Sequence, residues 1–440
     1  MLINFSFENW KSFRNKTDFS MVAGRESQHK ERLAGLPNVS KPKILPISAV
    51  YGGNASGKSN FITAIEFCKN MVCNNRNPKQ LIPVSPFQLS SGNAETPSRF
   101  YLNILGRNDS IYEYRFTVTR EKVLDESLVL CDLKKNEKDV CLYSRKEDKM
   151  EFHNQLSALY SNERLNFVFQ GTQDNQLFLA NAISQKVDVH HFTTVYRWFA
   201  EDLMILTPDS KSRFYPSKTK KGRQICSILS QLDTGIVDFG ETETSLEELR
   251  FPDGVLEMIR NELQVKRVPS LHVGPNLSFR LDNNELKATL LEPVHQDEGG
   301  NHMKFSFEDE SDGTLRIVDL LPMFIDIASS DSRSVFIVDE IDRSLHTHMI
   351  ESLVKAFLAS CTDQKRSQMV FTTHNVMLMD QDIFRRDEIW VTERQKGGES
   401  RLYSFAEFKE VRNDKKIAKS YLLGRMGGMP AISFSGFSEY

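Results

Sequence analysis

The chain has 440 residues, 40% of them hydrophobic and 26% charged, which is typical of a globular protein with room for two or three domains. A net charge of −3 excludes a globally basic surface for nucleic acid but allows a local patch. No stretch approaches the roughly 20 apolar residues of a membrane span, and the first residues lack the pattern of a secretory signal. The six cysteines are scattered without a C-x-x-C pair, so the sequence predicts neither a zinc site nor a disulfide framework. This cysteine usage is typical of a protein in a reducing cytoplasm.

The first recognisable unit is a strand, a loop and a helix over residues 44–72. The apolar segment 44–51 stops at a glycine, a loop of the form G-x-x-x-x-G-K-S follows, and apolar residues then recur at helical spacing. In such a P-loop, backbone N–H groups wrap a phosphate chain, the lysine neutralises the β/γ oxygens and the serine hydroxyl binds Mg²⁺. The sequence therefore predicts a nucleoside triphosphate site, with binding residues Gly52, Asn54, Gly57, Lys58, Ser59 and Asn60.

The segments at 100–105, 111–118, 123–131 and 140–143 are rich in β-formers and separated by turn residues. They predict an antiparallel meander inserted after the P-loop helix. Apolar residues at helical spacing then predict a mostly helical region.

A basic segment, KSRFYPSKTKKGR, spans residues 211–223 and carries no acidic residue. Pro216 and Gly222 predict a loop. Two interpretations stay open: a solvated connector, or a contact to nucleic-acid phosphates with Phe214 and Tyr215 stacking on bases. The six basic residues are Lys211, Arg213, Lys218, Lys220, Lys221 and Arg223.

From Gly313 onward, the pattern becomes α/β again. The buried strand 335–338 ends in Asp339 and Glu340. At the carboxyl end of such a strand, Asp339 can hold Mg²⁺, and Glu340 can orient or deprotonate an attacking water. The alternative is an acidic turn without a catalytic role. The P-loop in the same chain favours the metal and water site over this alternative.

A second strand, MVFTT, ends at His374, which can reach the γ-phosphate from the same sheet edge. The alternative is a surface histidine at the start of a loop. Upstream, Ser311 and Gly313 precede a helix and can donate to phosphate. Spacing does not separate that role from a plain helix N-cap.

Together these motifs resemble the ABC-type ATPases, in the branch of SMC, RecF and OLD-like proteins. The resemblance implies an α/β ABC-type head with an antiparallel β subdomain and a mostly helical insertion. It places Walker A at 52–59, Walker B at 335–340 and a divergent signature, ESDGT, at 310–314. It also makes His374 the switch histidine, Glu340 and His374 the catalytic pair, and Gln88 the Q-loop glutamine, with Ser59, Asp339 and Gln88 as ligands of Mg²⁺.

More narrowly, the phrases FENWKSF, DNQLFLANA, DEIDRSLH and YLLGRMGGMP are similar to the stand-alone bacterial AAA family ATPases typified by RloA, with AriA of the PARIS anti-phage system as a candidate relative. This resemblance implies ATP and Mg²⁺ as cofactors and a homodimer or larger homo-oligomer. It also implies a cytoplasmic role in phage defence beside a separately encoded effector, a Toprim- or HNH-type nuclease.

The chain departs from the family pattern at two places. Asp312 replaces the first glycine of the signature, and His346 stands where a dimer-contact aspartate is usual. The segment after His374 is too short for a Toprim domain, so an intrinsic nuclease of that type is not expected.

The expected organisation is an N-terminal ATPase part (1–150), a helical sensor or partner region (151–300) and a C-terminal ATPase part (301–440). The leading hypothesis is an ATP-driven switch. A DNA-binding repair ATPase of RecF type, or a nuclease or translocase in its own right, remains the alternative.

Overall fold

The computed structural model describes residues 1–440 except 38, 91–95, 133–137, 155, 157–161, 209, 211–218, 233, 253, 267, 275, 409–416 and 429–440. The chain forms two compact units, which are described separately. The first contains Met1–Thr207, Ser330–Asp342 and Ile350–Tyr440, and the second contains Pro208–Ser329 and Arg343–Met349. The expected boundaries at 150 and 300 therefore differ from those of the compact units.

The first unit contains a six-stranded sheet in the order β11-β17-β18-β5-β19-β20. Its strands are parallel except for the final β19–β20 pair. Strands β5, β17 and β18 are buried along their whole length, which explains their continuous apolar runs. The bounds are β5 Ile47–Tyr51, β11 Leu203–Leu206, β17 Val335–Val338, β18 Gln368–Thr372, β19 Ile389–Arg394 and β20 Ser400–Ser404.

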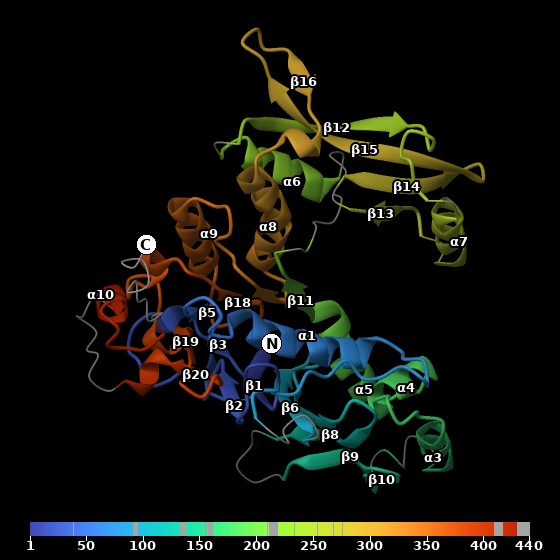
Figure 1. Ribbon diagram of the computed structural model, residues 1–440, viewed down its shortest axis with the longest axis vertical. Coiled ribbons are helices and arrows are strands. Elements are labelled where there is room, and N and C mark those ends of the chain that lie inside the picture. Colours follow the sequence, from blue (N-terminus) through green and yellow to red (C-terminus); the bar gives the residue numbers. More distant parts are fainter. Residues whose placement is uncertain are drawn as a thin grey trace, which may run out of the picture. The chain divides into compact units, whose positions relative to one another are not determined.

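A seven-stranded antiparallel sheet also belongs to the first unit, in the order β10-β9-β8-β7-β6-β1-β2 (Figure 1). It confirms the expected meander. Its alternating sequence puts one face in the core and leaves the other polar. The bounds are β1 Leu2–Glu8, β2 Thr17–Ser20, β6 Ser98–Leu105, β7 Ile111–Val118, β8 Val123–Cys131, β9 Val140–Lys146 and β10 Lys149–Phe152.

Helix α1 (Lys58–Cys73) joins the two sheets of this unit into one core. The Phe61 ring contacts Phe5, Phe7 and Phe19, all from the antiparallel sheet. Farther along the helix, Phe67 packs on Phe100 of β6. Aromatic burial thus fixes α1, and with it the loop that precedes α1.

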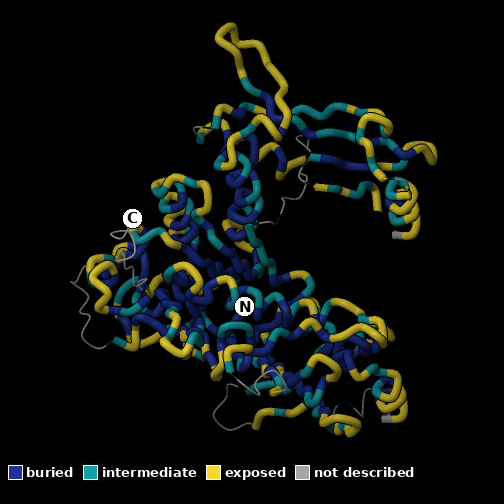
Figure 2. The backbone as a smooth tube through the Cα atoms, viewed as in Figure 1, coloured by how far each residue is buried: buried dark blue, intermediate teal, exposed yellow. Residues whose placement is uncertain are grey.

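The other elements of the first unit are short. Figure 2 shows buried segments running through its sheets and exposed segments at its loops. The helices are α3 Asn162–Gln170, α4 Phe178–Ser184, α5 His190–Arg197, α9 Thr347–Ala359 and α10 Ile417–Leu422. The short turns are η1 Lys30–Arg32, η3 Trp198–Asp202, η5 Val376–Leu378, η6 Arg386–Glu388 and η7 Phe405–Glu407, and a two-stranded pair comprises β3 Ala34–Gly35 and β4 Lys43–Ile44.

The second unit is a five-stranded sheet with helices. The strand order is β12-β15-β14-β13, and β16 pairs with β15. Residues 297–306, around the tip of the β15–β16 hairpin, are exposed (Figure 2). The bounds are α6 Lys220–Leu229, β12 Ile236–Thr244, α7 Val255–Lys266, β13 Leu271–Val273, β14 Leu277–Asp282, β15 Glu285–Gln296, β16 His302–Lys304, η4 Phe307–Asp309 and α8 Asp312–Ala328.

Two expectations about this region need correction. Residues 151–300 are only partly helical, because β11–β15 occupy much of the range. The loop expected over 211–223 is wrong for 220–223, which begin α6. The Thr219 side chain caps this helix by accepting the Gly222 N–H at 3.0 Å, and Ile225 and Leu229 are buried. Packing of these apolar residues outweighs the low helix propensity of one glycine.

Candidate functional site

The loop between β5 and α1 has a backbone that requires glycine at two positions. Gly52 has φ 155° and Gly57 has φ 114°. A Cβ on Gly52 would lie 2.3 Å from Thr392 Oγ1, and a Cβ on Gly57 would lie 2.6 Å from Ser400 Oγ. Side chains there would clash with β19 and β20, so both glycines are needed for close packing of the loop against the sheet.

Lys58, the first residue of α1, is buried and folds back over this loop. Its Nζ donates to the carbonyl oxygens of Gly52 at 2.9 Å and Gly53 at 3.1 Å. Burial lowers the pKa of Lys58, and the nearby carboxylates of Walker B oppose that effect. The ammonium is thus held at the loop, where it can exchange carbonyl partners for phosphate oxygens.

The acidic pair lies at the carboxyl end of β17. Asp339 is buried, and its Oδ1 accepts a hydrogen bond from Thr372 Oγ1 at 2.5 Å. The same Thr372 oxygen accepts the Glu340 N–H at 2.7 Å. Glu340 has φ 50°, a left-handed conformation that is rare for a non-glycine residue and clusters at functional sites. The strained turn separates the two carboxylates, one fixed in the sheet and one facing the cleft.

His374 follows β18, the strand between β5 and β17. Its backbone N–H donates to Asp342 Oδ2 at 3.3 Å. Partial burial and the charge of Lys58 lower the pKa of His374, although Asp342 and the Walker B carboxylates oppose the shift. At neutral pH the imidazole is therefore mostly neutral and can both donate and accept.

These elements converge on one cleft of about 860 Å³ in the first unit. Gly52 and Asp339 are not among the lining residues. Gly52 accepts a hydrogen bond from Lys58, which lines the cleft, and Asp339 shares the Thr372 hydroxyl with Glu340, which also lines it. Gln88, the weakest sequence match, does line it. The lining residues are Lys11, Ser12, Asn54, Ala55, Ser56, Gly57, Lys58, Ser59, Asn60, Ser85, Pro86, Phe87, Gln88, Leu89, Glu340, His374, Arg394 and Gly398.

Several of these residues were missed by sequence reasoning, among them Lys11, Ser12 and Arg394. Lys11 has φ 47° in the turn after β1, and Ser12 Oγ accepts hydrogen bonds from Asn60 Nδ2 at 2.8 Å and Ser400 Oγ at 2.7 Å. Arg394 ends β19. A cation at or shortly after the end of each of two strands was the available signal, but only tertiary structure shows that both cations lie at the same cleft.

The segment around Gln88 is held by the same turn. Phe87 N–H donates to Asn9 Oδ1 at 2.9 Å, and Lys11 N–H donates to the Ser85 carbonyl at 2.6 Å. The Gln88 side chain is exposed at the cleft. These hydrogen bonds place the Gln88 segment at the same cleft as Ser59.

Ser311 and Gly313 belong to the second unit. Ser311 is the N-cap of α8, and its Oγ accepts the Thr314 N–H at 3.1 Å. A Cβ on Gly313 would lie 2.8 Å from the Ser344 carbonyl oxygen. The structure thus supports the N-cap interpretation, while Ser311 and Asp312 remain exposed at the helix start. His346 is exposed in the same unit.

Among the expected basic residues, Lys220, Lys221 and Arg223 lie in the first turn of α6. Lys211, Arg213 and Lys218 fall outside the described residues.

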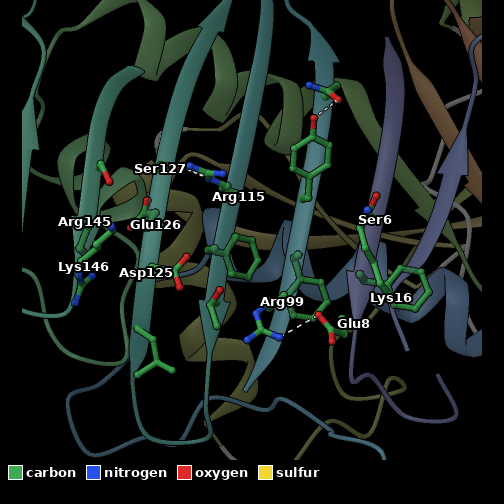
Figure 3. A pocket seen from close by; sticks show the side chains of 18 of the residues that line it. Ser6, Glu8, Lys16, Arg99, Arg115, Asp125, Glu126, Ser127, Arg145 and Lys146 are labelled. Carbon is green, nitrogen blue, oxygen red and sulfur yellow. Dashed lines mark hydrogen bonds and ion pairs between the residues drawn. The ribbon is translucent and has the colours of Figure 1, made fainter. Parts of the chain in front are cut away.

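A larger hollow, of about 1160 Å³, lies on the polar face of the seven-stranded sheet (Figure 3). Its charges largely neutralise one another: Arg99 pairs with Glu8 at 3.0 Å, and Lys16 pairs with Asp18 at 2.8 Å. It also contains no glycine loop at a helix start. Size alone therefore does not make this hollow the phosphate site.

The residues of the cleft fit a nucleoside triphosphate with Mg²⁺. The glycine backbone leaves a cradle that a Cβ would fill, and the N–H groups at the start of the 16-residue helix α1 favour an anion. Mg²⁺ usually takes one or two protein ligands together with phosphate oxygens and water, which matches Ser59 with Asp339. When bound, the ion would neutralise charge on the phosphates.

A family model described as "AAA domain, putative AbiEii toxin, Type IV TA system" matches residues 47–166 and 238–380, more than half of the chain. The matched ranges include the loop before α1, both carboxylates of the acidic pair and His374. A comparison with curated proteins finds no match.

Three solved structures are similar at low identity. The SMC head domain from Thermotoga maritima is 14% identical, covering 92% of this chain and 98% of that one, with a TM-score of 0.32. The SmcHead bound to the C-winged helix domain of ScpA is 14% identical, and the match covers 92% of this chain and 97% of that one with a TM-score of 0.40. The recombination mediator protein RecF-ATPrS is 12% identical, and the match covers 91% of this chain and 98% of that one with a TM-score of 0.36. At these TM-scores, the likeness adds nothing to what the strand order and family match establish.

Proposed function

The chain belongs to the family of AAA domains described as "putative AbiEii toxin, Type IV TA system", and we propose that it is the ATP-driven regulatory switch of a bacterial defence system. It is an ATPase of the ABC-type P-loop class. In the proposal it works in the cytoplasm, in keeping with its six free thiols, and its nucleotide state controls a separately encoded nuclease effector of Toprim or HNH type. Within the described residues, no helix is long and apolar enough to cross a membrane.

One observation carries the hydrolytic part of the proposal: Lys58, Glu340 and His374 line the same cleft. The loop N–H groups and Lys58 bind the phosphate chain. Glu340, on its strained turn, faces the cleft and orients or deprotonates the attacking water. His374, mostly neutral, donates to the γ-phosphate oxygen that gains charge.

The dimeric part of the proposal rests on a different feature. The described residues that line the cleft belong to the first unit, and the start of α8 is exposed in the second unit. We propose that Ser311 and Gly313 of one chain face the γ-phosphate held by another chain, so that two chains enclose two nucleotides. Hydrolysis would then separate them, which gives the switch its two states.

The defence role is supported by the toxin system that the family description names. A RecF-type repair ATPase is the alternative. Direct DNA contact would involve Lys220, Lys221 and Arg223, whose replacement should then reduce the salt dependence of DNA binding.

Mass photometry of the purified full-length chain tests the switch. Wild type and Glu340→Gln are measured with and without ATP and Mg²⁺. The proposal predicts that ATP increases the dimer or larger assembly, and that Glu340→Gln retains it. A Glu340→Gln chain that binds ATP yet stays monomeric would contradict the enclosed-nucleotide dimer.

A further inference from the structure

A turn near the carboxyl end of the described chain lies against the phosphate-binding loop, and the mechanism above does not use it. This glycine turn comprises residues 421–428, at the end of α10 and beyond. Gly424, Gly427 and Gly428 all have positive φ, at 69°, 66° and 71°. Three left-handed glycines within five residues fold the backbone back sharply.

The glycine turn is hydrogen-bonded directly to the loop. The Gly53 N–H donates to the Gly428 carbonyl oxygen at 3.0 Å. The Tyr421 hydroxyl donates to the same oxygen at 3.2 Å, so this acceptor has two donors. The Tyr421 ring also lies 6.2 Å from that of Tyr51, the last residue of β5. The turn thus contacts both the strand that leads into the loop and the loop itself.

The glycine turn is seated closely on β19 and β20. A Cβ on Gly428 would lie 2.3 Å from Val391 Cγ1, and a Cβ on Gly427 would lie 2.1 Å from the Tyr403 hydroxyl. That hydroxyl donates to the Met426 carbonyl at 2.8 Å. Because Val391 is fully buried in the sheet, a side chain at Gly428 can be accommodated only if the turn moves.

The same end of β19 holds the loop directly. Thr392 Oγ1 donates to the Tyr51 carbonyl at 3.2 Å and is hydrogen-bonded to Ser56 Oγ at 2.7 Å. Its neighbour Glu393 accepts the Gly428 N–H at 3.3 Å. Strand β19 therefore connects the glycine turn and the phosphate-binding loop in one hydrogen-bonded assembly.

We infer that the glycine turn is a positioning element of the nucleotide site, which fixes Gly53 and thereby the backbone that receives the phosphates. The residues of the turn are not among those that line the cleft. The turn acts by preorganising the loop, so that binding does not have to order it. This inference rests on nucleotide binding at the cleft and is independent of the proposed dimer and effector.

The test compares two alanine substitutions that impose nearly the same backbone strain. Gly428→Ala adds the clash with Val391, whereas a Cβ on Gly424 would meet no atom of the described residues within 4 Å. The dissociation constant for ATP is measured with Mg²⁺ in the Glu340→Gln background, and the melting temperature is measured without nucleotide. We expect Gly428→Ala to weaken ATP binding ~10-fold and Gly424→Ala to change it less than ~2-fold, at similar melting temperatures.

Two further variants keep the test valid if Gly428→Ala misfolds: one that rescues the substitution and one with a milder effect. Val391→Ala removes the clashing methyl group and should restore ATP affinity to Gly428→Ala. Tyr421→Phe removes one donor to the Gly428 oxygen and should weaken ATP binding ~3-fold without lowering the melting temperature.

The inference is overturned if Gly428→Ala and Gly424→Ala affect ATP binding equally, or if Tyr421→Phe binds ATP like its parent. Failure of the Glu340→Gln parent to bind ATP would instead contradict the nucleotide site itself. The two failures are therefore distinguishable.

Discussion

Thr372 and Asp339 join the carboxyl ends of two neighbouring parallel strands through a buried hydrogen bond of 2.5 Å. The threonine hydroxyl donates to the carboxylate and, at the same oxygen, accepts the Glu340 N–H. A single side chain on β18 thus orients both acidic residues that follow β17. This arrangement gives Asp339, the proposed metal ligand, a fixed direction before any ligand arrives.

Thr372→Val should therefore raise the Mg²⁺ concentration needed for half-maximal ATP hydrolysis. It removes a hydrogen bond to a buried charged group, worth about 1.5–3 kcal/mol, so a ~10-fold increase is expected. This concentration is measured by recording the rate of ATP hydrolysis while Mg²⁺ is titrated. Thr372→Ser keeps the hydroxyl and should behave like wild type, and a Thr372→Val enzyme with unchanged Mg²⁺ dependence would show that Asp339 needs no such orientation.

The lowered pKa of His374 predicts how hydrolysis responds to pH. A histidine whose pKa lies below its usual value stays neutral throughout the neutral range and gains its proton only at lower pH. We therefore expect the hydrolysis rate of wild type to show no acid limb at the ordinary histidine pKa of about 6.5. His374→Gln, which retains a neutral donor, should keep more activity than His374→Ala. Equal activities of the two variants would argue against a hydrogen-bonding role for this side chain.

Substitutions at Ser311 separate its role as the N-cap of α8 from its proposed role facing the γ-phosphate of another chain. Aspartate and asparagine cap helices about as well as serine, whereas alanine costs about 1 kcal/mol. Ser311→Asp and Ser311→Asn should thus keep the unfolding temperature, but the aspartate would place a negative charge facing the γ-phosphate in the proposed dimer. We expect hydrolysis to fall ~10-fold or more for Ser311→Asp relative to Ser311→Asn, as for a like charge brought close to a reacting anion. Equal rates would leave Ser311 as a helix cap alone.

A buried network elsewhere in the first unit should make stability depend on pH. Glu388 is fully buried, and its Oε2 accepts hydrogen bonds from the Arg385 N–H and from Arg32. Within the described part of the chain, its Oε1 has no hydrogen-bond partner, which fits a protonated carboxyl group. Burial raises the pKa of Glu388 from 4.5 to about 7, with Arg32 and Arg385 opposing the shift.

Because the folded pKa lies above the unfolded one, the native state binds more protons between these two values. The contribution to stability is complete below pH 4.5 and is lost as the pH rises through about 7. We expect the free energy of unfolding of wild type to fall by roughly 1–3 kcal/mol across this range, and Glu388→Gln to reduce that slope. Urea unfolding at several pH values measures it, with the exposed Glu121→Gln as control. An unchanged slope in Glu388→Gln would contradict the raised pKa.

The sequence predicted the parts of the fold whose patterns are local. Strands β7 and β8 have the expected bounds, because their segments are rich in β-formers and separated by turn residues. The phosphate-binding loop was recognisable because its glycines, lysine and serine are consecutive. The order of β5, β18 and β17, which brings His374 between the two motifs, has no local pattern in the sequence.

Features that depend on distant contacts could not be predicted. Lys11 and Arg394 are far apart in the sequence, yet both line the same cleft. The contact between Gly53 and Gly428 has no local pattern, because it depends on how the glycine turn packs on β19. Similarly, the first turn of α6 contains a glycine and clustered lysines, and only its buried apolar side explains why it is helical.

The most direct test of the ATPase account is phosphate release from ATP with Mg²⁺, measured together with ATP binding for wild type, Glu340→Gln and Lys58→Ala. We predict that Glu340→Gln retains ATP binding while its hydrolysis falls by about 10²–10⁴-fold, the usual contribution of a general base. Lys58→Ala should lose binding and hydrolysis together. Glu340→Gln hydrolysing ATP at the wild-type rate would contradict the assignment of this cleft as the catalytic site.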